Sequence, residues 1–379
     1  MPLQNGMLNI YILLFCQTKN NMKTFLSAFL LVLVGFVASA QGPIRVCVAG
    51  LNHDHAHGIL NRYKDGTVDI VGIAEPNKEL WVKYGKLYHI PDSLFFTDLK
   101  QMLLLKKPDA VLGYNAVGNH VDVVEICAPL HIPVMVEKPL AATLEQAKRI
   151  EALANEYKIR VLVNYETTWY ASNLANYNTI AADSIGKIRK MVVHDGHQGP
   201  KEIGCSKEFL SWLTDPVLNG AGPLNDFGCY GADLMTWFMH GQKPLAVTAI
   251  AHHYKPEIYP KVEDDATILV EYPTASGQIE ASWNWPFSIK DMEIFGETGY
   301  LHALDGKSIV SRMRENIKGA KTASPLPAPI NDPIIYLTAV LRGKISGNDD
   351  QSSLNYNMIV MQILDAAKRS IKEGKKIVL

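Results

Sequence analysis

The stretch IRVCVAGLNHDHAHG, from Ile44 to Gly58, decides the fold class. Its first residues are mostly apolar and predict a buried strand, and Gly50 follows as a turn residue before a helix. This order places backbone N–H groups and the positive end of a helix dipole together, which suits a phosphate group. Apolar runs separated by helix-length segments predict βαβ units. We therefore expect a doubly wound parallel sheet, the Rossmann arrangement, over residues 43–163, with further strands at 68–75, 110–113, 133–136 and 160–163.

Residues after Asn164 follow a different pattern, in which apolar and polar side chains alternate with a period of two. Because few helix-length segments separate these runs, we expect a mostly antiparallel open sheet. A proline-rich loop at 323–333 then precedes two expected helices. The sequence thus predicts an α/β domain followed by an α+β domain over residues 164–379, with strands at 188–193, 245–250, 266–272 and 278–283.

The charge balance excludes some kinds of partner. The 379 residues include 37 basic and 38 acidic side chains, and no run is rich in Lys and Arg. Nucleic acid or an anionic membrane would select an excess of basic residues. We therefore expect no nucleic-acid partner and favour a small neutral ligand.

The amino terminus has the layout of a secretory signal. An apolar run over residues 25–37 follows Lys23 and ends in the small residues 38–40. This run is shorter than the ~20 apolar residues that a spanning helix needs. We predict a signal peptide over residues 1–40, with Met22 as an alternative start of translation. The mature protein is expected to be periplasmic or secreted, without stable membrane insertion after processing.

The turn after the first strand departs from the usual dinucleotide fingerprint. That fingerprint has Gly at its third and sixth places, where this chain has Asn52 and His55. Asn can adopt the left-handed conformation that a tight turn needs, whereas His is bulkier than the close helix–strand contact normally admits. We still expect Gly50, Asn52, His53 and His55 to bind the cofactor.

A carboxylate at the end of the second expected strand indicates which dinucleotide binds. Glu75 stands 25 positions after Gly50. A carboxylate at this place can accept hydrogen bonds from both ribose hydroxyls and repels a 2′-phosphate. The sequence therefore predicts NAD rather than NADP. The alternative interpretation is an exposed acidic turn residue before Pro76.

Alternating histidines raise the question of a metal site. His53, His55 and His57 are suitable ligand types, and His53 and His57 would share one helical face. No carboxylate or Cys partner has a diagnostic spacing, so we expect no metal. Hydrogen bonding to phosphate or substrate is the favoured role, with plain packing as the alternative.

Two segments carry the candidate catalytic residues. Glu137-Lys138-Pro139 follows an apolar strand, where a doubly wound sheet presents functional groups. Residues 220–230 open an apolar helix, on which Asp226 and Tyr230 would project from one face. Such groups beside a nicotinamide can take the hydroxyl proton as a hydride leaves the same carbon. Each also has an ordinary interpretation, as a solvated charge, a helix cap and a core residue respectively.

These residues resemble the glucose-fructose oxidoreductase and inositol dehydrogenase (Gfo/Idh/MocA) family over essentially the whole mature chain. The Glu-Lys-Pro segment and the Gly-Pro-Leu-Asn-Asp segment at 222–226 are the most specific. The resemblance implies that Lys138 and Asp226 are catalytic. Tyr230 stands where many members have His, and looks like the glucose-fructose oxidoreductase branch. The similarity also includes Val48-Ala49-Gly50, Asn119-His120 and the ending 370–376.

The resemblance carries further expectations about contacts and assembly. It implies a homodimer or homotetramer built through the open sheet of the second domain. The chain departs from the family at the Asn52/His55 turn and at residues 164–169, where members often carry Arg. The expected cofactor contacts then also include Asn115, His120, Glu137, Lys138 and Trp169.

A pyranose sugar or glycoside is the expected substrate, because aromatic faces and hydroxyl-binding groups are both available. Trp169, Trp212, Trp283 and Trp285 could supply apolar faces or could equally be core residues. Cys205 and Cys229 could pair in an oxidising compartment. The expected substrate-binding residues are Lys138, His197, Asn225, Asp226 and Tyr230.

The sequence thus predicts an NAD-dependent oxidoreductase that moves a hydride between a sugar hydroxyl carbon and a tightly held nicotinamide. Two alternatives remain open: redox-neutral glycoside cleavage through a transient keto-sugar, and a non-catalytic sugar-binding or scaffold protein on a degenerate Rossmann fold. Lys138 is the expected proton carrier. Its replacement by Met should stop turnover and leave folding and nucleotide binding nearly intact.

The first testable prediction concerns processing. Export should remove everything before Gln41, because the apolar run and the small residues 38–40 form one export unit. Amino-terminal sequencing of the exported protein measures this directly. A membrane-bound product that still starts at Met22 or earlier would contradict it.

Overall fold

Strand β1 (Arg45–Ala49) lies inside a six-stranded sheet with the order β3-β2-β1-β4-β5-β6. Every pairing in this sheet is parallel. The chain leaves β1 towards β2 on one side and later returns to β4 on the other, which creates a crevice at the carboxyl ends of the strands. The computed structural model describes residues 42–313 and 315–379, so the expected signal peptide lies outside the described residues.

The first sheet is buried on both faces, which explains its apolar runs. All four residues of β4 and of β5 are buried. Helices of this part begin at ordinary caps; for example, Asn77 accepts a hydrogen bond from the Glu79 N–H. Its other elements are α2 (Ala56–Leu60), β2 (Asp69–Ala74), α3 (Lys78–Tyr88), β3 (Phe95–Phe96), α4 (Leu99–Lys106), β4 (Ala110–Gly113), α5 (His120–Cys127), β5 (Val134–Glu137), α6 (Leu144–Tyr157) and β6 (Val161–Asn164), with 3₁₀ turns η1 (Asp92–Leu94), η2 (Val117–Asn119), η3 (Ala128–Leu130) and η4 (Glu166–Trp169).

A nine-stranded sheet follows, with the order β14-β13-β12-β11-β7-β10-β9-β8-β15. It is antiparallel except for the parallel β7–β10 pair, which confirms the predicted mixture of folds. The sequence did not predict β3 or β11–β15. The elements are α7 (Ala171–Ala181), β7 (Ile188–Gly196), α8 (Lys207–Leu213), α9 (Pro223–Asp226), α10 (Gly228–Phe238), β8 (Ala246–His252), β9 (Asp265–Glu271), β10 (Ser276–Ser282), β11 (Ile289–Gly296), β12 (Gly299–Ala303), β13 (Ser308–Met313), β14 (Asn316–Thr322), α11 (Pro333–Leu341), α12 (Leu354–Glu373) and β15 (Ile377–Val378).

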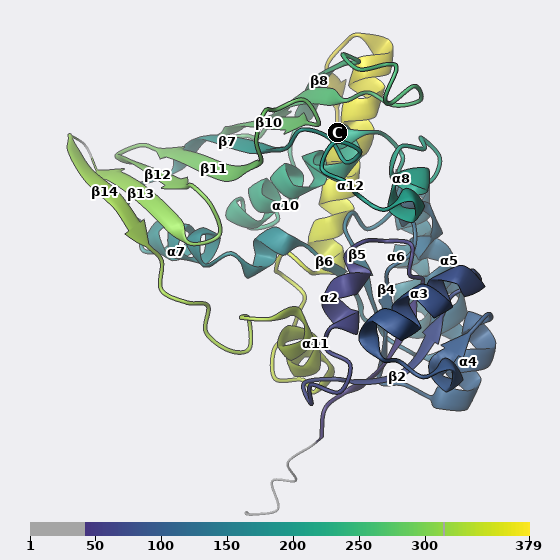
Figure 1. Cartoon of the computed structure of the whole chain (residues 1–379). Helices are drawn as coiled ribbons and strands as arrows, with labels where there is room; N and C mark the ends of the chain where they lie inside the picture. Colours follow the sequence, from purple (N-terminus) through teal and green to yellow (C-terminus); the bar gives the residue numbers. More distant parts are fainter. Residues whose placement is uncertain (1–41, 314) are drawn as a thin grey trace, which may run out of the picture. The chain divides into compact units, whose positions relative to one another are not determined.

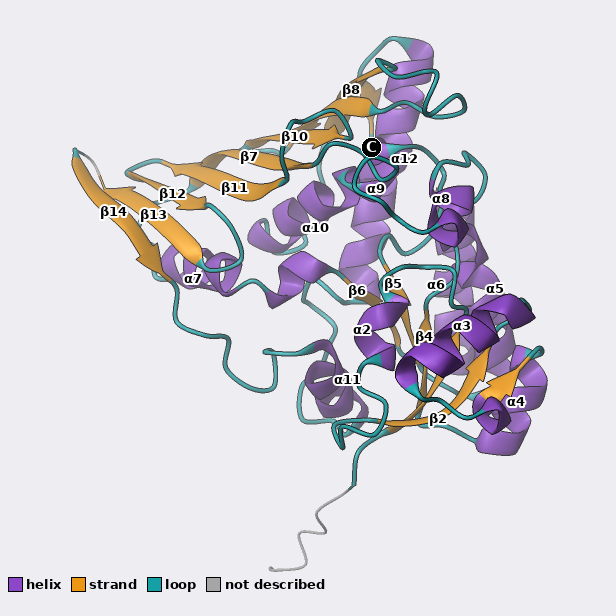
Figure 2. Cartoon of the chain, viewed as in Figure 1, coloured by secondary structure: helices purple, strands orange, loops and turns teal. Residues whose placement is uncertain are grey.

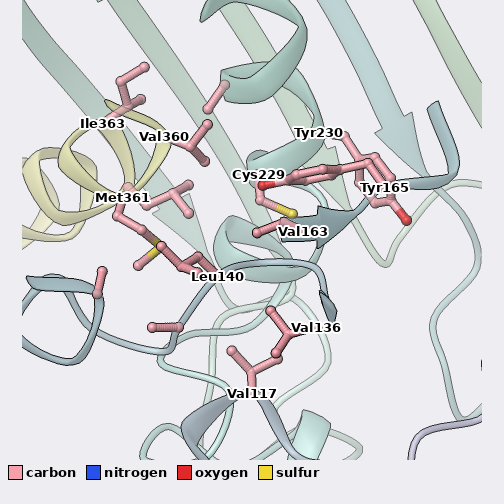
Figure 3. Packing of buried hydrophobic residues seen from close by; sticks show 14 of the residues in the cluster. Val117, Val136, Leu140, Val163, Tyr165, Cys229, Tyr230, Val360, Met361 and Ile363 are labelled. Atoms are coloured by element: carbon pink, nitrogen blue, oxygen red, sulfur yellow. The ribbon is translucent and has the colours of Figure 1, made fainter. Parts of the chain in front are cut away.

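The two sheets share one apolar core. Helices α10 and α12 pack beside the second sheet (Figures 1 and 2), and α12 also contacts α6 and β6 of the first part. Figure 3 shows side chains from both parts in one cluster: Val136 and Val163 from the first sheet, Tyr230 from α10 and Met361 from α12. The strands and helices that carry the site are therefore held by a continuous core.

The last part of the chain returns to the first sheet. Ile334 and Leu337 of α11 belong to the apolar cluster formed by α2, α3 and one face of that sheet. Arg62, in the turn that follows α2, pairs with Asp332, the N-cap of α11, at this contact. Residues 333–341 thus complete the first layer although they lie far along the sequence.

Two further observations concern expectations from the sequence. Within the described residues, no helix combines the length and the apolar character needed to cross a bilayer. Cys205 and Cys229 are both free thiols in the structure, so the considered disulfide is not formed.

Candidate active site

Strand β5 delivers Lys138 to the carboxyl edge of the first sheet, as the sequence predicts. The Lys138 Nζ donates hydrogen bonds to Asp226 Oδ1 at 2.6 Å and to the Asp226 carbonyl oxygen at 2.9 Å. Only about one twentieth of each residue is exposed: 5% for both. The two predicted catalytic residues therefore form a buried ion pair that joins the two parts of the chain.

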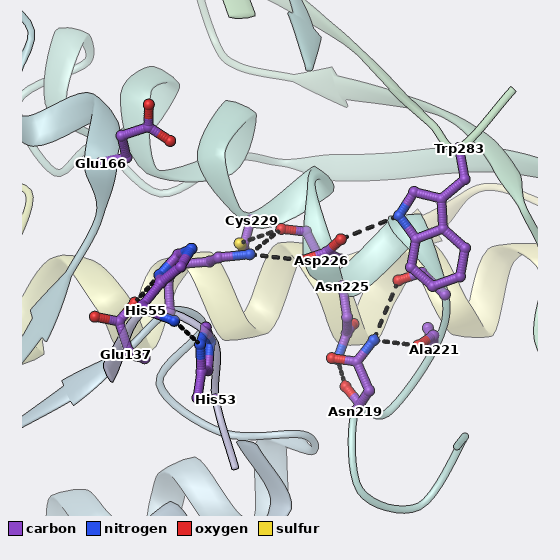
Figure 4. Close-up of polar contacts among 12 residues, drawn as sticks. His53, His55, Glu137, Glu166, Asn219, Ala221, Asn225, Asp226, Cys229 and Trp283 are labelled. Atoms are coloured by element: carbon purple, nitrogen blue, oxygen red, sulfur yellow. Dashed lines mark hydrogen bonds and ion pairs between the residues drawn. The ribbon is translucent and has the colours of Figure 1, made fainter. Parts of the chain in front are cut away.

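Asp226 is held in place by the tight turn that precedes it. A Cβ on Gly222 would lie 1.9 Å from the Glu263 carbonyl oxygen, so only glycine fits beside that strand end. Pro223 then starts the short helix α9, which ends at Asp226. The second carboxylate oxygen of Asp226 accepts a hydrogen bond from Trp283 Nε1 at 3.0 Å (Figure 4). Both oxygens of this carboxylate thus have partners.

The ion pair fixes the protonation of both partners. Burial alone would lower the pKa of Lys138, but the Asp226 carboxylate outweighs burial and raises that pKa above its usual value. Burial likewise opposes the charge of Asp226, yet Lys138 holds the pKa of this carboxyl below its usual value. At neutral pH the pair is an ammonium and a carboxylate.

Tyr230 is packed more deeply than the sequence suggests. Its ring meets Tyr165 edge-on at 5.6 Å between centroids, and burial raises the pKa of the phenol well above its usual value. The Lys138 and Lys290 ammonium groups lie 4.9 Å and 4.6 Å from its ring centroid. Tyr230 therefore keeps its proton and gives the two cations an aromatic face.

A second charged group was missed by sequence reasoning. Lys290 of β11 forms an ion pair with Glu166 of η4, and both are near buried Asp195 of β7. Burial is the main cause that raises the pKa of Asp195, to about 8. Its Oδ1 is buried without a hydrogen-bond partner. At neutral pH this carboxyl is therefore protonated, while Lys290 and Glu166 cancel each other's charge.

His197 continues the inward-facing positions of β7 after Asp195. Its Nδ1 accepts a hydrogen bond from the Gly199 N–H at 2.9 Å, so the neutral ring carries its proton on Nε2. Burial lowers the pKa of His197. The ring packs edge-on against Phe227 at 4.9 Å. His197 is thus a neutral donor beside the Lys138–Asp226 pair.

The turn between β1 and α2, called the first turn from here on, accommodates the bulk of His55 because this side chain does not enter the helix–strand contact. Gly50 has φ +83°, and a Cβ there would lie 2.7 Å from Asn115 Cβ, so glycine is required. Asn52 is not among the described residues with positive φ, so its left-handed capacity is not used. Ala56 fills the close helix contact and is fully buried. His55 instead turns outward.

His55 joins a chain of hydrogen bonds at the ends of β5 and β6. Its Nδ1 lies 2.7 Å from Glu137 Oε2. Glu137 Oε1 accepts from Asn164 Nδ2 at 2.8 Å, and Asn164 Oδ1 accepts from Trp169 Nε1 at 2.9 Å. Burial would raise the pKa of Glu137, but His55 and the other donors hold it below its usual value. The predicted residues His55, Glu137 and Trp169 are therefore connected through Asn164.

A cavity of about 440 Å³ opens beside this chain of hydrogen bonds. It is bounded by α2 and the residues on either side of that helix, by the first residues of α11, and by the carboxyl ends of β4, β5 and β6. Its polar lining includes His55, Arg62, Glu137, Asn164 and Glu166. The cavity is large enough for a small ring compound, and Glu166 in its lining pairs with Lys290.

Several buried polar groups near the first turn fit a bound dinucleotide. Oδ1 of Asn52 and Oδ1 of Asn115 are buried without a partner in the chain. Glu75 is 5% exposed and accepts the Leu51 and Asn77 N–H groups, each at 2.8 Å. Burial raises the pKa of Glu75. This carboxylate lies at the first turn rather than in an exposed loop, which fits the predicted ribose contact.

Two other predicted residues lie in less open places. His120 is fully buried, contacts the Leu140 carbonyl oxygen through Nδ1 at 3.2 Å, and has a pKa lowered by burial to about 4. Asn225 is fully buried and donates to the carbonyl oxygens of Asn219 and Ala142, so it braces two loops. Neither side chain faces the 440 Å³ cavity.

The four tryptophans are not equivalent. Trp212 and Trp283 are almost fully buried, and their Nε1 groups donate to the Asn52 carbonyl oxygen and to Asp226. These two side chains are core residues that connect separate segments through hydrogen bonds, and neither exposes a ring face to which a sugar could bind. Trp169 lines the cavity and Trp285 is partly exposed, so these two retain the predicted capacity.

One set of described side chains has ligand atoms close enough for a metal: His53, His55 and Glu137, within 4.8 Å of one another. His53 Nδ1 already accepts the His55 N–H at 3.1 Å, which leaves its neutral ring protonated on Nε2. Burial lowers the pKa of His53, and Lys138 adds a positive charge nearby. His57 lies apart, against Tyr88. These contacts favour hydrogen bonding over metal binding, and the absence of a metal stays a prediction.

The sheet order, the glycine turn and the buried Lys–Asp pair define an NAD-binding oxidoreductase of the Rossmann class. Residues 44–165 match the oxidoreductase family with an NAD-binding Rossmann fold, and residues 177–302 match the GFO/IDH/MocA C-terminal domain. These stretches cover more than half of the chain. The protein belongs to the Gfo/Idh/MocA family, and its first domain is an NAD-binding domain.

Curated relatives of the chain are distant. Trans-1,2-dihydrobenzene-1,2-diol dehydrogenase of Sus scrofa is 21% identical over 238 residues, covering 62% of this chain and 66% of that protein. Rhizopine catabolism protein MocA of Rhizobium meliloti is 22% identical over 256 residues, covering 61% and 73%. The chain therefore spans about two thirds of the length of the pig dehydrogenase.

Solved structures share the fold at low identity. An aldose-aldose oxidoreductase from Caulobacter crescentus, complexed with glycerol, has a TM-score of 0.75 at 18% identity and covers 89% of this chain and all of that one, 100%. An inositol dehydrogenase homolog from Azotobacter vinelandii, complexed with NAD+, has a TM-score of 0.76 at 17% identity, covering 89% and 98%. Both likenesses are evidence for the two-part architecture.

The buried pair leads to an expectation for Lys138→Met that differs from the one drawn from the sequence. Lys138→Met should not leave folding intact, because it strands the Asp226 carboxylate in the interior; we expect a loss of about 3–5 kcal/mol in the free energy of unfolding. Adding Asp226→Asn should restore much of that loss. Urea unfolding of both variants, with exposed Lys148→Met as the control, measures this. A double variant less stable than the single one would contradict it.

Proposed function

We propose that this protein transfers a hydride between a hydroxyl-bearing carbon of a sugar or glycoside and a tightly held NAD. The observation that carries the proposal is the buried Lys138–Asp226 pair, at the sheet edge where the NAD-binding domain meets the second domain. An ammonium in this position can hold a substrate oxygen and stabilise negative charge on it as the carbon is oxidised.

The charges of the site favour an uncharged substrate. Lys138 is paired with Asp226, and Lys290 is paired with Glu166. Asp195 is protonated at neutral pH and His197 is neutral. A substrate with its own charge would need an unpaired opposite charge, because burying an unpaired ion is costly. A polyhydroxylated neutral molecule instead matches the surplus of hydrogen-bond donors.

Bound NAD supplies the hydride acceptor. The chain's own residues then bind and orient the substrate: Lys138 and His197 donate hydrogen bonds to its oxygen atoms, and the Tyr230 face packs beneath them. Trp283 fixes the Asp226 carboxylate, which in turn aims Lys138. Water is excluded by the core around Tyr165 and Tyr230.

Redox-neutral glycoside cleavage is the second candidate function. Asp195 favours it, because a buried carboxyl with a pKa of about 8 can donate a proton at neutral pH. Such an acid is needed to protonate a leaving glycosidic oxygen after transient oxidation of the sugar. The alternative of a non-catalytic scaffold predicts neither bound NAD nor hydride exchange.

We further propose a periplasmic or secreted homodimer or homotetramer. The outer face of the second sheet carries exposed apolar side chains, including Ile250 at 57%, Leu269 at 47% and Phe295 at 38% exposure. Burying such a face against a second copy removes apolar area from water. Sedimentation of the mature protein at the mass of one chain would contradict this assembly.

Hydride exchange tests the function. The purified protein should release NAD on denaturation, and incubation with carbon-deuterated sugars and glycosides should place deuterium on that NAD, as measured by mass spectrometry. Lys138→Met should exchange about 10²-fold more slowly or worse. Release of an aglycone without net NADH would identify glycoside cleavage. Bound NAD that gains no deuterium from any sugar would refute the substrate class.

Nucleotide preference tests Glu75. Cofactor-free protein should bind NAD about 10- to 100-fold more tightly than NADP, because the carboxylate accepts ribose hydroxyls and repels a 2′-phosphate. Glu75→Gln should reduce this preference, and its amide oxygen can still accept a turn N–H group. Calorimetric titration of both nucleotides gives the ratio. An unchanged ratio in Glu75→Gln would show that Glu75 only supports the turn.

A further inference from the structure

Oxidation of a hydroxyl group needs a group that accepts the hydroxyl proton. Lys138 cannot do so at neutral pH, because Asp226 keeps it protonated. Tyr230 keeps its phenolic proton, since burial raises its pKa. The Asp226 carboxylate already accepts hydrogen bonds on both oxygens, from Lys138 and Trp283. The predicted catalytic residues therefore lack a free proton acceptor.

The other titratable groups near the site are also unsuitable as acceptors of the hydroxyl proton. His197 carries its proton on Nε2, because Nδ1 accepts the Gly199 N–H. Asp195 is already protonated at neutral pH. The Glu166 carboxylate is engaged by Lys290 and the Tyr170 hydroxyl, and its pKa is lowered although burial would raise it. His120 is fully buried and lies away from the cavity.

His55 differs from all of these. Its Nδ1 lies 2.7 Å from the Glu137 carboxylate, which can only accept a hydrogen bond, so the proton of the neutral ring is on Nδ1. Nε2 then has a free lone pair and no partner among the described residues. The side chain is 44% exposed and lines the 440 Å³ cavity together with Glu166.

Glu137 is itself rigidly oriented, which makes the His55 geometry reproducible. It is 2% exposed at the end of β5, and Asn164 and Trp169 fix its second oxygen. A buried carboxylate that holds one imidazole nitrogen is the usual way to set a histidine's tautomer and to stabilise its protonated form. Figure 4 shows His55 and Glu137 joined on one side of the site, with Asp226 on the other.

We propose that His55, oriented by Glu137, is the proton acceptor of this site. The inference rests on the proposed sugar oxidation. The hydroxyl O–H bond breaks and its proton binds His55 Nε2, while the carbon-bound hydrogen leaves with its electron pair to the nicotinamide. The carbon becomes a carbonyl, and NAD⁺, when bound, would supply the two-electron oxidant that takes up the hydride. The imidazolium is stabilised by Glu137, and the reverse reaction returns the proton.

The charges around His55 are compatible with this role. His53 packs against it at 4.4 Å between ring centroids and is held neutral by burial. Glu137 and Glu166 contribute negative charge, while Lys138 is paired with Asp226. Arg62, in the turn after α2, is neutralised by Asp332. Two carboxylates, Glu137 and Glu166, are thus near the His55 ring, while the neighbouring cations Lys138 and Arg62 are each paired with an aspartate.

Kinetics of two variants test the role. His55→Asn should lower the rate of sugar oxidation by about 10²–10⁴-fold. Glu137→Gln should also slow sugar oxidation, because a neutral amide holds the His55 tautomer and stabilises the imidazolium less well than a carboxylate does. His57→Asn is the matched control, since His57 contacts Tyr88 instead. Full activity in His55→Asn overturns the proposal.

A spectroscopic measurement separates this proposal from the proposed function. Nitrogen-15 spectra of histidine-labelled protein, assigned by the signal lost in His55→Asn, report which ring nitrogen carries the proton. We expect Nδ1 to be protonated and Nε2 to be free. A proton on Nε2 would overturn the role of His55 whatever the substrate. Unsubstituted protein that binds NAD and oxidises no sugar, with the expected tautomer, would instead overturn the sugar substrate.

Discussion

The buried ion pair between Lys138 and Asp226 is the constraint on which the other features of the site depend. Two charges inside a protein are tolerated only while each keeps its partner, because desolvation of an unpaired ion costs several kcal/mol. Lys138 comes from the edge of the first sheet, and Asp226 comes from the turn before α10. The pair therefore fixes the distance between the two layers where the reacting groups must meet. The shared apolar core, and α12, which contacts elements of both parts, stabilise this arrangement.

The same constraint distributes the protons of the site. Paired lysines remain cationic, the buried phenol of Tyr230 and the carboxyl of Asp195 remain protonated, and His197 is a neutral donor. Donors thus outnumber acceptors. A hydroxyl-rich substrate finds many hydrogen bonds here, but few places to leave a proton. This imbalance gives the His55–Glu137 contact its importance.

Local sequence signals were sufficient for the fold class and for the position of Lys138, whereas the choice of Asp226 as its partner needed the family resemblance. The β1–Gly50 turn and the end of β5 follow from apolar runs and strand-to-helix order, and Asp226 follows from the family resemblance. Lys290 and Asp195 were missed because their roles depend on the register of β7 and β11, and β11 was not predicted. The alternation of Val193, Asp195 and His197 was the available signal for Asp195.

His55 shows a different limit of sequence reasoning. Its bulk looked like a defect of the glycine turn, because local reasoning considers only the helix that follows. Glu137, its partner, lies 82 positions away and approaches only after β1 and β5 have entered one sheet. The same limit applies to Trp212 and Trp283. Segments distant in the sequence bury both rings, so neither is available to bind a sugar.

Helix α8 closes over the first turn, and this contact bears on how long a cofactor stays. Trp212 donates to the Asn52 carbonyl oxygen, Ser206 donates to Asp54, and Phe209 packs on His53. If a dinucleotide bound at this turn also lay beneath α8, its release would require these contacts to open, and that opening would set its residence time. Slow exchange of this kind turns a shuttling coenzyme into a resident one. Each oxidised substrate would then need a second molecule to restore the same nicotinamide before the next cycle.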